Sequence, residues 1–314
     1  MHVLAAAVLL SGCGTRIFNL ASLVKAQSDG TASTFSQTQE VLEIQALAGW
    51  DFIDLKYVLA DPGKVHYVVY DTLPAAPPSA IEIKNASVSG DIIAVGTADV
   101  PTADTEVTEP VSATIVESTP YYIYSVAEDE NGVLLDDATI EYKTLTTPQR
   151  FRPITYVSAV ATADTTVSTT VGYYQYLPRE FFKDPSKKLP VLFFAHGAGE
   201  KASAFDVPNL SLILLHGPPR LINLNTWDET LPFIVVAPQM WRRSNPEWRN
   251  EGKSYADEVF ARLAADYPGR IDLDRVYLTG LSWGGNFTYS YISDVTRNSR
   301  IAAAVPVAGW YGTG

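Results

Sequence analysis

The second half of the chain takes its fold from the stretch Val276-Tyr277-Leu278-Thr279-Gly280-Leu281-Ser282-Trp283-Gly284-Gly285. Residues 276–279 predict a buried strand, and a helix is predicted from Gly285 toward Asp294. The small residues around Ser282 allow strand and helix to approach closely across a strained turn. In this strand–turn–helix context the pattern G-x-S-x-G predicts a serine lifted above the sheet, where its hydroxyl acts as a nucleophile.

Short apolar runs recur at wide intervals on both sides of this turn, at residues 191–195, 233–237, 276–279 and 302–307. Such runs are typical of strands buried on both faces of a parallel sheet. An opening pair of strands is predicted at 154–160 and 170–177. A helix is predicted between the second and third runs, with Ser254 and Asp257 as a capping box and Pro268-Gly269 as its end. Residues 149–314 are therefore predicted to form an α/β domain.

A second motif, His196-Gly197-Ala198-Gly199-Glu200, directly follows the predicted strand 191–195. A carbonyl that becomes tetrahedral gains negative charge on oxygen, and two fixed backbone N–H groups stabilise that charge. The small side chains at Gly197, Ala198 and Gly199 leave the backbone accessible. We expect the amide of Ala198, or alternatively of Gly199, to act together with the amide of Trp283. We expect His196 to hold this loop by a hydrogen bond rather than to act as the general base.

Residues 41–148 are predicted to be all-β. The runs 65–70, 121–127 and 138–144 are rich in β-branched and aromatic residues, and Asn131-Gly132 is a hairpin turn signal. Short strands between Pro, Gly and Asp turns indicate a β-sandwich. Its last hairpin resembles the end of a fibronectin type III or immunoglobulin-like domain, with Tyr122 as a candidate tyrosine-corner residue.

A spacer is the favoured role for this predicted sandwich, and carbohydrate or surface binding is the alternative. Trp50, Phe52 and Tyr57 are its large aromatic residues near the start. We expect them in the core rather than on a platform for sugars.

The first 13 residues form a short apolar run that ends in Leu10-Ser11-Gly12-Cys13. The run is too short to cross a bilayer and suits a signal peptide. The last four residues resemble a bacterial lipobox, although no Lys or Arg precedes Cys13. The resemblance implies a lipid on Cys13 that anchors the protein in the bacterial cell envelope. Residues 14–40, rich in Ser, Thr, Gln and Ala, are predicted to be a flexible linker.

The composition of the chain excludes some classes of binding partner. The net charge of −12 argues against nucleic acid, because phosphate binding needs a basic face. The histidine, cysteine and acidic residues show no metal-ligand spacing, and no cofactor is expected.

The two glycine-rich motifs, together with Val236-Ala237-Pro238-Gln239 and the run 272–280, resemble a known group of enzymes. The group comprises secreted esterases and related peptidases similar to polyhydroxybutyrate depolymerases, feruloyl esterases and the prolyl oligopeptidase catalytic domain. The resemblance covers roughly residues 188–312, and some members carry an immunoglobulin-like domain ahead of the hydrolase. It implies an α/β-hydrolase fold and hydrolysis of carboxylic esters through an acyl-enzyme on Ser282. It does not fix the substrate.

The sequence departs from this pattern after Ser282. Hydrolases of this fold order their triad as serine, then acid, then histidine. All four histidines, His2, His66, His196 and His216, precede Ser282, and Asp294 is the one acidic residue that follows it. Asp294 is expected on the helix after the turn, away from the site. We therefore expect an incomplete sheet, a partial catalytic domain over 149–314, and a chain that is inactive without its acid and histidine.

Two other functions remain open from the sequence. A serine peptidase of the prolyl oligopeptidase type is the alternative among enzymes, and a non-catalytic, surface-binding lipoprotein is the alternative outside them. Tyr255, Trp241 and Trp248 are expected either to line the substrate region or to pack in the core. His216, in an insertion after the strand 191–195, is a candidate for the pocket wall.

Overall fold

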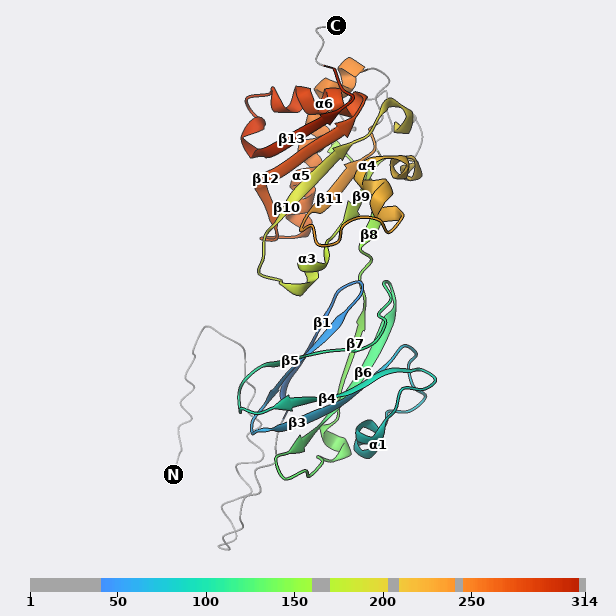
Figure 1. Cartoon of the computed structure of the whole chain (residues 1–314), viewed down its shortest axis with the longest axis vertical. Helices are drawn as coiled ribbons and strands as arrows, with labels where there is room; N and C mark the ends of the chain where they lie inside the picture. Colours follow the sequence, from blue (N-terminus) through green and yellow to red (C-terminus); the bar gives the residue numbers. More distant parts are fainter. Residues whose placement is uncertain (1–40, 160–169, 203–208, 241–244, 311–314) are drawn as a thin grey trace, which may run out of the picture. The chain divides into compact units, whose positions relative to one another are not determined.

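The computed structural model describes residues 41–159, 170–202, 209–240 and 245–310. Cys13, the lipobox and the linker 14–40 lie outside the described residues. Along the described chain an all-β part is followed by an α/β part (Figure 1). Among the described helices, none is both long enough and apolar enough to cross a membrane.

Two antiparallel sheets that share one core form the all-β part. The three-stranded sheet has the order β1-β2-β5, namely Val41–Ala48, Ile53–Leu59 and Val107–Pro110. The four-stranded sheet has the order β4-β3-β6-β7, namely Ile92–Val100, Gly63–Tyr70, Pro120–Asp129 and Glu141–Thr146. Helix α1 (Ala80–Asn85) packs on the four-stranded sheet, where Ala80 and Ile83 join a second, smaller core.

The predicted all-β character and the final hairpin are confirmed, with two corrections. The returning strand begins at Glu141 rather than at residue 138, because a short 3₁₀ turn (Asp137–Thr139) intervenes. The tyrosine that bonds back to the upstream backbone is Tyr121, not Tyr122: its buried hydroxyl accepts the Val116 N–H at 2.8 Å. Side chains alternate along a strand, so Tyr121 faces the shared core and Tyr122 faces the smaller one.

The aromatic residues near the start of the all-β part are buried, as expected from the sequence. Trp50, Phe52 and Tyr57 are 8%, 5% and 0% exposed. Tyr57 also shares a hydrogen bond of 3.1 Å with Ser125 Oγ. Tyr57 therefore belongs to the shared core, whereas Trp50 and Phe52 are buried against Arg150, Arg179 and Lys183. None of the three rings is exposed as a sugar platform.

A six-stranded sheet with the order β13-β12-β10-β11-β9-β8 is the centre of the α/β part. Strands β10 (Leu189–Ala195), β11 (Ile234–Pro238), β12 (Ile271–Leu281) and β13 (Ile301–Val307) are parallel to their neighbours within this group. Strands β8 (Phe151–Val157) and β9 (Thr170–Tyr176) form the predicted opening antiparallel pair.

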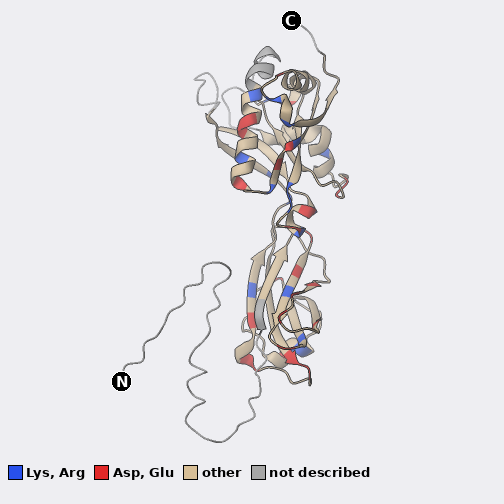
Figure 2. Cartoon of the chain, turned by 90° about the vertical axis from the view of Figure 1, so that its left-hand side faces the viewer, with Lys and Arg blue, Asp and Glu red and all other residues tan. Residues whose placement is uncertain are grey.

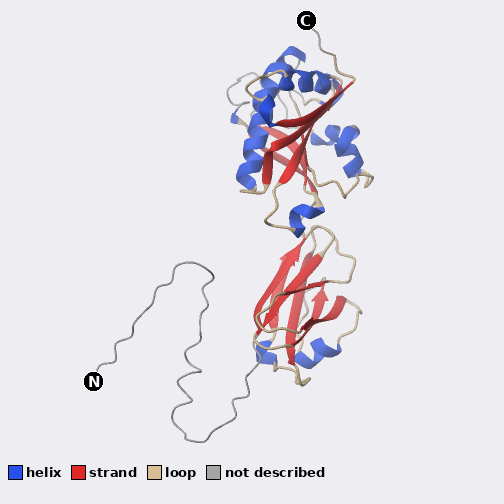
Figure 3. Ribbon diagram, turned by 60° about the vertical axis from the view of Figure 1, so that its left-hand side comes forward, coloured by secondary structure: helices blue, strands red, loops and turns tan. Residues whose placement is uncertain are grey.

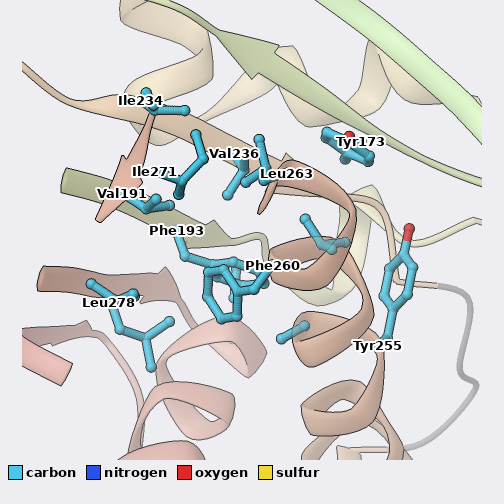
Figure 4. Packing of buried hydrophobic residues seen from close by; sticks show 14 of the residues in the cluster. Tyr173, Val191, Phe193, Ile234, Val236, Tyr255, Phe260, Leu263, Ile271 and Leu278 are labelled. Carbon is cyan, nitrogen blue, oxygen red and sulfur yellow. The ribbon is translucent and has the colours of Figure 1, made fainter. Parts of the chain in front are cut away.

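Helices cover both faces of this sheet (Figure 3). Val191 and Phe193 of β10 point to one face and join residues of α5 (Asn245–Asp266) and α6 (Trp283–Ile292) in the main core (Figure 4). The intervening residues Leu192 and Phe194 point to the opposite face, where α4 (Gly217–Asn223) and a 3₁₀ turn (Leu210–Leu215) pack. A further short helix, α3 (Arg179–Lys183), precedes β10. The continuous apolar runs of β10 and β11 thus reflect burial on both faces. The same prediction is wrong for residues 302–307 in β13, none of whose positions is fully buried.

The long helix α5 begins at Asn245, nine residues before the predicted start. Ser254 lies inside the helix, so the proposed capping box is wrong. Instead, Asp257 accepts hydrogen bonds from Arg297 Nε at 2.6 Å and from the Tyr291 hydroxyl at 2.8 Å. The predicted end is confirmed, since α5 stops at Asp266, ahead of Pro268.

Acidic and basic residues are interspersed along the described part of the chain (Figure 2). One apolar strip stands out at the edge of the six-stranded sheet. Within the described residues β13 pairs with β12 alone. Its Val305 and Val307 side chains are 61% and 46% exposed.

Candidate active site

Ser282 joins β12, which ends at Leu281, to α6, which begins at Trp283. Its backbone has φ 54° and ψ −110°, a conformation that residues with a Cβ rarely adopt. The Ser282 N–H donates to Val307 O at 2.9 Å, and Ser282 O accepts from the Asn286 N–H at 3.0 Å. The predicted strained strand–turn–helix connection is therefore present.

Three glycines of the motif are required by close backbone approach. A Cβ on Gly284 would lie 1.9 Å from Ala195 O, at the end of β10. A Cβ on Gly280 would lie 2.3 Å from Gly284 O, and one on Gly285 would lie 2.7 Å from the Cα of Gly309. Gly309 follows β13 and was missed by the sequence reasoning, since nothing in the local pattern links it to the turn.

The loop after β10 is held by His196, which is fully buried. The Met240 N–H donates to His196 Nε2 at 2.9 Å, so the ring proton lies on Nδ1, which donates to Gly197 O at 2.6 Å. Burial lowers the pKa of His196 to about 4. Both nitrogens of a neutral ring therefore bond to backbone, which fixes the loop and leaves neither nitrogen free to take a proton from Ser282.

Gln239 was missed as a second support of this loop. Its buried side-chain Nε2 donates to Glu200 O and to Asn209 O, each at 2.8 Å. The neighbouring Met240 O accepts the Ala202 N–H at 2.8 Å. The end of β11 thus ties the loop on both sides. In the sequence, Gln239 could have been recognised as a candidate because it is a polar residue directly after a buried apolar strand.

Glu200 and Ser282 meet at Gly197. A Cβ on Gly197 would lie 3.0 Å from Glu200 Oε2 and 3.8 Å from Ser282 Cβ. Ala198 and Gly199 form a 3₁₀ turn with Glu200, and a Cβ on Gly199 would meet nothing within 4 Å. Trp283 opens α6, and Lys201 Nζ lies 5.3 Å from the centre of its ring. The structure therefore brings the predicted loop and the predicted serine together.

Asp294 lies two residues beyond the end of α6, so about 15 Å of helix separates it from Ser282. Hydrogen bonds from Thr296 and Lys253 hold the pKa of Asp294 well below its usual range. Arg297 also donates to its carboxylate at 2.8 Å. Asp294 is thus part of an ion-pair cluster away from the serine.

Other candidates from the sequence have different places. Tyr255 is fully buried in the main core and donates to Gly172 O at 3.0 Å, so it packs rather than lines a pocket. Trp241 and the side chain of Trp248 lie outside the described residues. The side chain of His216 is 51% exposed, with Nε2 3.5 Å from Glu200 Oε1. The described ranges contain no group of three or more His, Cys, Asp or Glu arranged to hold a metal ion.

No protein-family model matches the chain. A stretch of 128 residues is 32% identical to a bifunctional acetylxylan esterase/xylanase from Neocallimastix patriciarum. It covers 36% of this chain and 18% of that protein, so the chain spans less than a fifth of that relative.

Several solved esterase structures are similar to the chain. A thermostable esterase is 17% identical, with 88% of this chain and 78% of that chain covered and a TM-score of 0.35. A ferulic acid esterase is 19% identical over 51% of this chain and 61% of its own, with a TM-score of 0.35. An esterase from Pyrobaculum calidifontis is 21% identical over 51% and 45%, with a TM-score of 0.34. These structural likenesses are weak in both identity and TM-score.

Proposed function

We propose that this chain is a serine hydrolase of the α/β-hydrolase type that cleaves carboxylic esters. The observation that carries the proposal is the positive φ of Ser282 between β12 and α6, packed through glycines against the end of β10. Such a turn exposes a serine hydroxyl at the carboxyl end of a mostly parallel sheet. The stretch that is similar to an acetylxylan esterase/xylanase supports an ester as the bond that is cleaved.

In the proposed reaction Ser282 Oγ attacks the ester carbonyl carbon while a general base takes the hydroxyl proton. The carbonyl oxygen becomes an oxyanion, which the backbone N–H groups of Ala198, or of Gly199, and of Trp283 stabilise. The C–O bond to the alcohol then breaks, and the proton passes to the leaving alcohol. Water hydrolyses the resulting acyl-enzyme to the free acid.

The base in this class of enzyme is a histidine oriented by a carboxylate. His196 does not fit this role because both ring nitrogens bond to backbone. Asp294 does not fit the role of the carboxylate because it is held in an ion-pair cluster with Lys253 and Arg297. We propose that neither residue belongs to the triad.

The substrates are proposed to be esters attached to polysaccharides. This rests on the similarity of a 128-residue stretch to the acetylxylan esterase/xylanase from Neocallimastix patriciarum. Esters of acetate or aromatic acids on a sugar chain share the reactive carbonyl that the Ser282 turn and the loop 196–200 suit.

The all-β part is proposed to be an immunoglobulin or fibronectin III-like domain that acts as a spacer. Its described strands number seven, in sheets β1-β2-β5 and β4-β3-β6-β7 that share a core. The bond between the Tyr121 hydroxyl and the Val116 N–H resembles a tyrosine corner.

We also propose that Cys13 is lipidated and anchors the protein in a bacterial cell envelope, on the strength of Leu10-Ser11-Gly12-Cys13. In cells fed a palmitate analogue, the wild type should be labelled and Cys13→Ser should not. Equal labelling and membrane retention of the variant would refute the anchor.

Ser282→Ala tests the proposed function in the protein expressed from its complete reading frame. Loss of the nucleophile should abolish labelling by a fluorophosphonate probe and lower turnover of p-nitrophenyl acetate by several orders of magnitude. Ser293→Ala, at an exposed serine just after α6, is the matched control. It should keep both the labelling and the turnover of the wild type. Persistent labelling of Ser282→Ala would place the nucleophile elsewhere.

A further inference from the structure

The carboxylate of Glu200 is buried beside the candidate site without a full set of donors. The residue is 3% exposed, and its Oε1 accepts no hydrogen bond from any described residue. Its Oε2 lies 3.9 Å from His196 Nδ1, but that nitrogen already donates its proton to Gly197 O. A buried carboxylate is unfavourable unless hydrogen-bond donors reach it. Oε1 is therefore suited to a donor brought by a ligand.

The position of Glu200 indicates where that donor lies. Glu200 Oε2 and Ser282 Cβ are both within 4 Å of one point beside Gly197. A group that reaches the carboxylate is thus next to an ester carbonyl held at Ser282. The half-exposed His216 presents Nε2 at 3.5 Å from Oε1.

Glu200 and His216 together determine which chemical group of a ligand fits between them. A hydroxyl group can donate to a carboxylate oxygen and accept from an imidazole N–H at the same time. An ammonium ion can only donate, so it could not accept an imidazole N–H from His216. A hydroxyl therefore matches Glu200 and His216 together.

We propose that Glu200 and His216 form a subsite that binds a free hydroxyl group of the substrate beside the scissile ester. The subsite selects partly acylated polyols, such as a sugar that carries one ester next to an unmodified hydroxyl. The inference rests on the proposed function, because it places the scissile ester at Ser282.

Binding to the whole chain tests the subsite without requiring turnover. By calorimetry, the Kd of monoacetylated xylobiose is compared with the Kd of fully acetylated xylobiose, which has no hydroxyl. We expect the wild type to prefer the monoacetylated ligand by about tenfold or more, as a hydrogen bond to a charged group supplies. Glu200→Leu should lose this preference, and Glu200→Gln should reduce it. Glu180→Leu, at an exposed carboxylate paired with Lys187, should keep it.

Thermal unfolding of each variant shows whether it is folded. If Glu200→Leu does not fold, the nearly isosteric Glu200→Gln takes its place in the comparison. A wild type that binds neither ligand or does not distinguish them overturns the subsite, as do folded Glu200 variants with an unchanged preference. Ser282→Ala should keep the preference. If Ser282→Ala still reacts with fluorophosphonate while the Glu200 variants lose the preference, the proposed function fails and the hydroxyl subsite stands.

Discussion

Ser282 holds its strained backbone because glycines nearby let three backbone segments meet. Gly280 and Gly284 face each other and the end of β10, while Gly285 faces Gly309 after β13. Each contact is between backbone atoms, which cannot move aside as a flexible side chain can. The turn is therefore sensitive to single methyl groups.

Gly284→Ala should lower the free energy of unfolding by about 3 kcal/mol, at the upper end for overpacking, because the new Cβ would lie 1.9 Å from Ala195 O. Gly199→Ala is the matched control, since its Cβ would meet nothing within 4 Å. That variant should stay within about 0.5 kcal/mol of the wild type. Urea denaturation measures both, and equal stability of the two variants would contradict the close approach.

His196 makes stability depend on pH. Its pKa is about 4 in the folded protein against an ordinary value of 6.5, because burial disfavours the charged ring. Between these values the unfolded chain binds a proton that the native protein does not. The free energy of unfolding therefore falls as the pH decreases from 6.5 to about 4.

We expect this contribution to reach about 3 kcal/mol at pH 4, from the size of the pKa difference. His196→Gln lacks this titrating group. Its free energy of unfolding should therefore fall by about 3 kcal/mol less than that of the wild type between pH 7 and pH 4. Other acidic groups titrate in both proteins and cancel in the difference. Denaturation curves with the same pH dependence for both proteins would rule out this role of His196.

At the scale of elements, β13 lies at one edge of the six-stranded sheet within the described residues. Its exposed positions include two large apolar side chains, Val305 and Val307. Exposed apolar edge strands pair with other chains. This strand is consequently the expected site of self-association.

Val305→Lys should reduce self-association of the chain, because a charge on an edge strand opposes pairing. Light scattering after gel filtration at rising concentration measures the effect. Val295→Lys is the control: Val295 is 84% exposed but lies in a turn after α6. If both lysines act equally, general charge rather than the β13 edge is responsible.

At the scale of the whole molecule, the all-β part and the α/β part have separate cores. The sandwich core takes its buried members from residues 44–127, and the main α/β core takes its members from residues 171–291. A sandwich with its own core should fold by itself.

Residues 41–148 alone should therefore unfold in one cooperative transition. Leu55→Ala, at a fully buried position of β2, should cost about 2–5 kcal/mol. Val133→Ala, at a position 59% exposed, should stay within about 0.5 kcal/mol. Calorimetry checks all three, and a broad transition without a heat-absorption peak would show that the sandwich depends on the rest of the chain.

The sequence by itself determined the kinds of elements and their order. Alternating and continuous apolar runs predicted the sandwich, the opening strand pair and the burial of β10 and β11 on both faces. Gly280, Ser282 and Gly284 predicted the strained turn before α6. These predictions succeeded because each depends on neighbours within about ten residues, where strand and helix periodicity acts.

Only the tertiary structure decided which side chains meet. Asp257 bonds to Arg297, 40 residues away, rather than capping a helix with Ser254, which lies inside α5. The alternation of side chains along β6 places the hydroxyl of Tyr121, not that of Tyr122, at the Val116 N–H. Gln239 bonds to Glu200, 39 residues away, and Gly309 packs against Gly285, 24 residues away, which no local pattern specifies. Long-range packing sets these contacts, because the sheet brings the ends of separate strands to one edge.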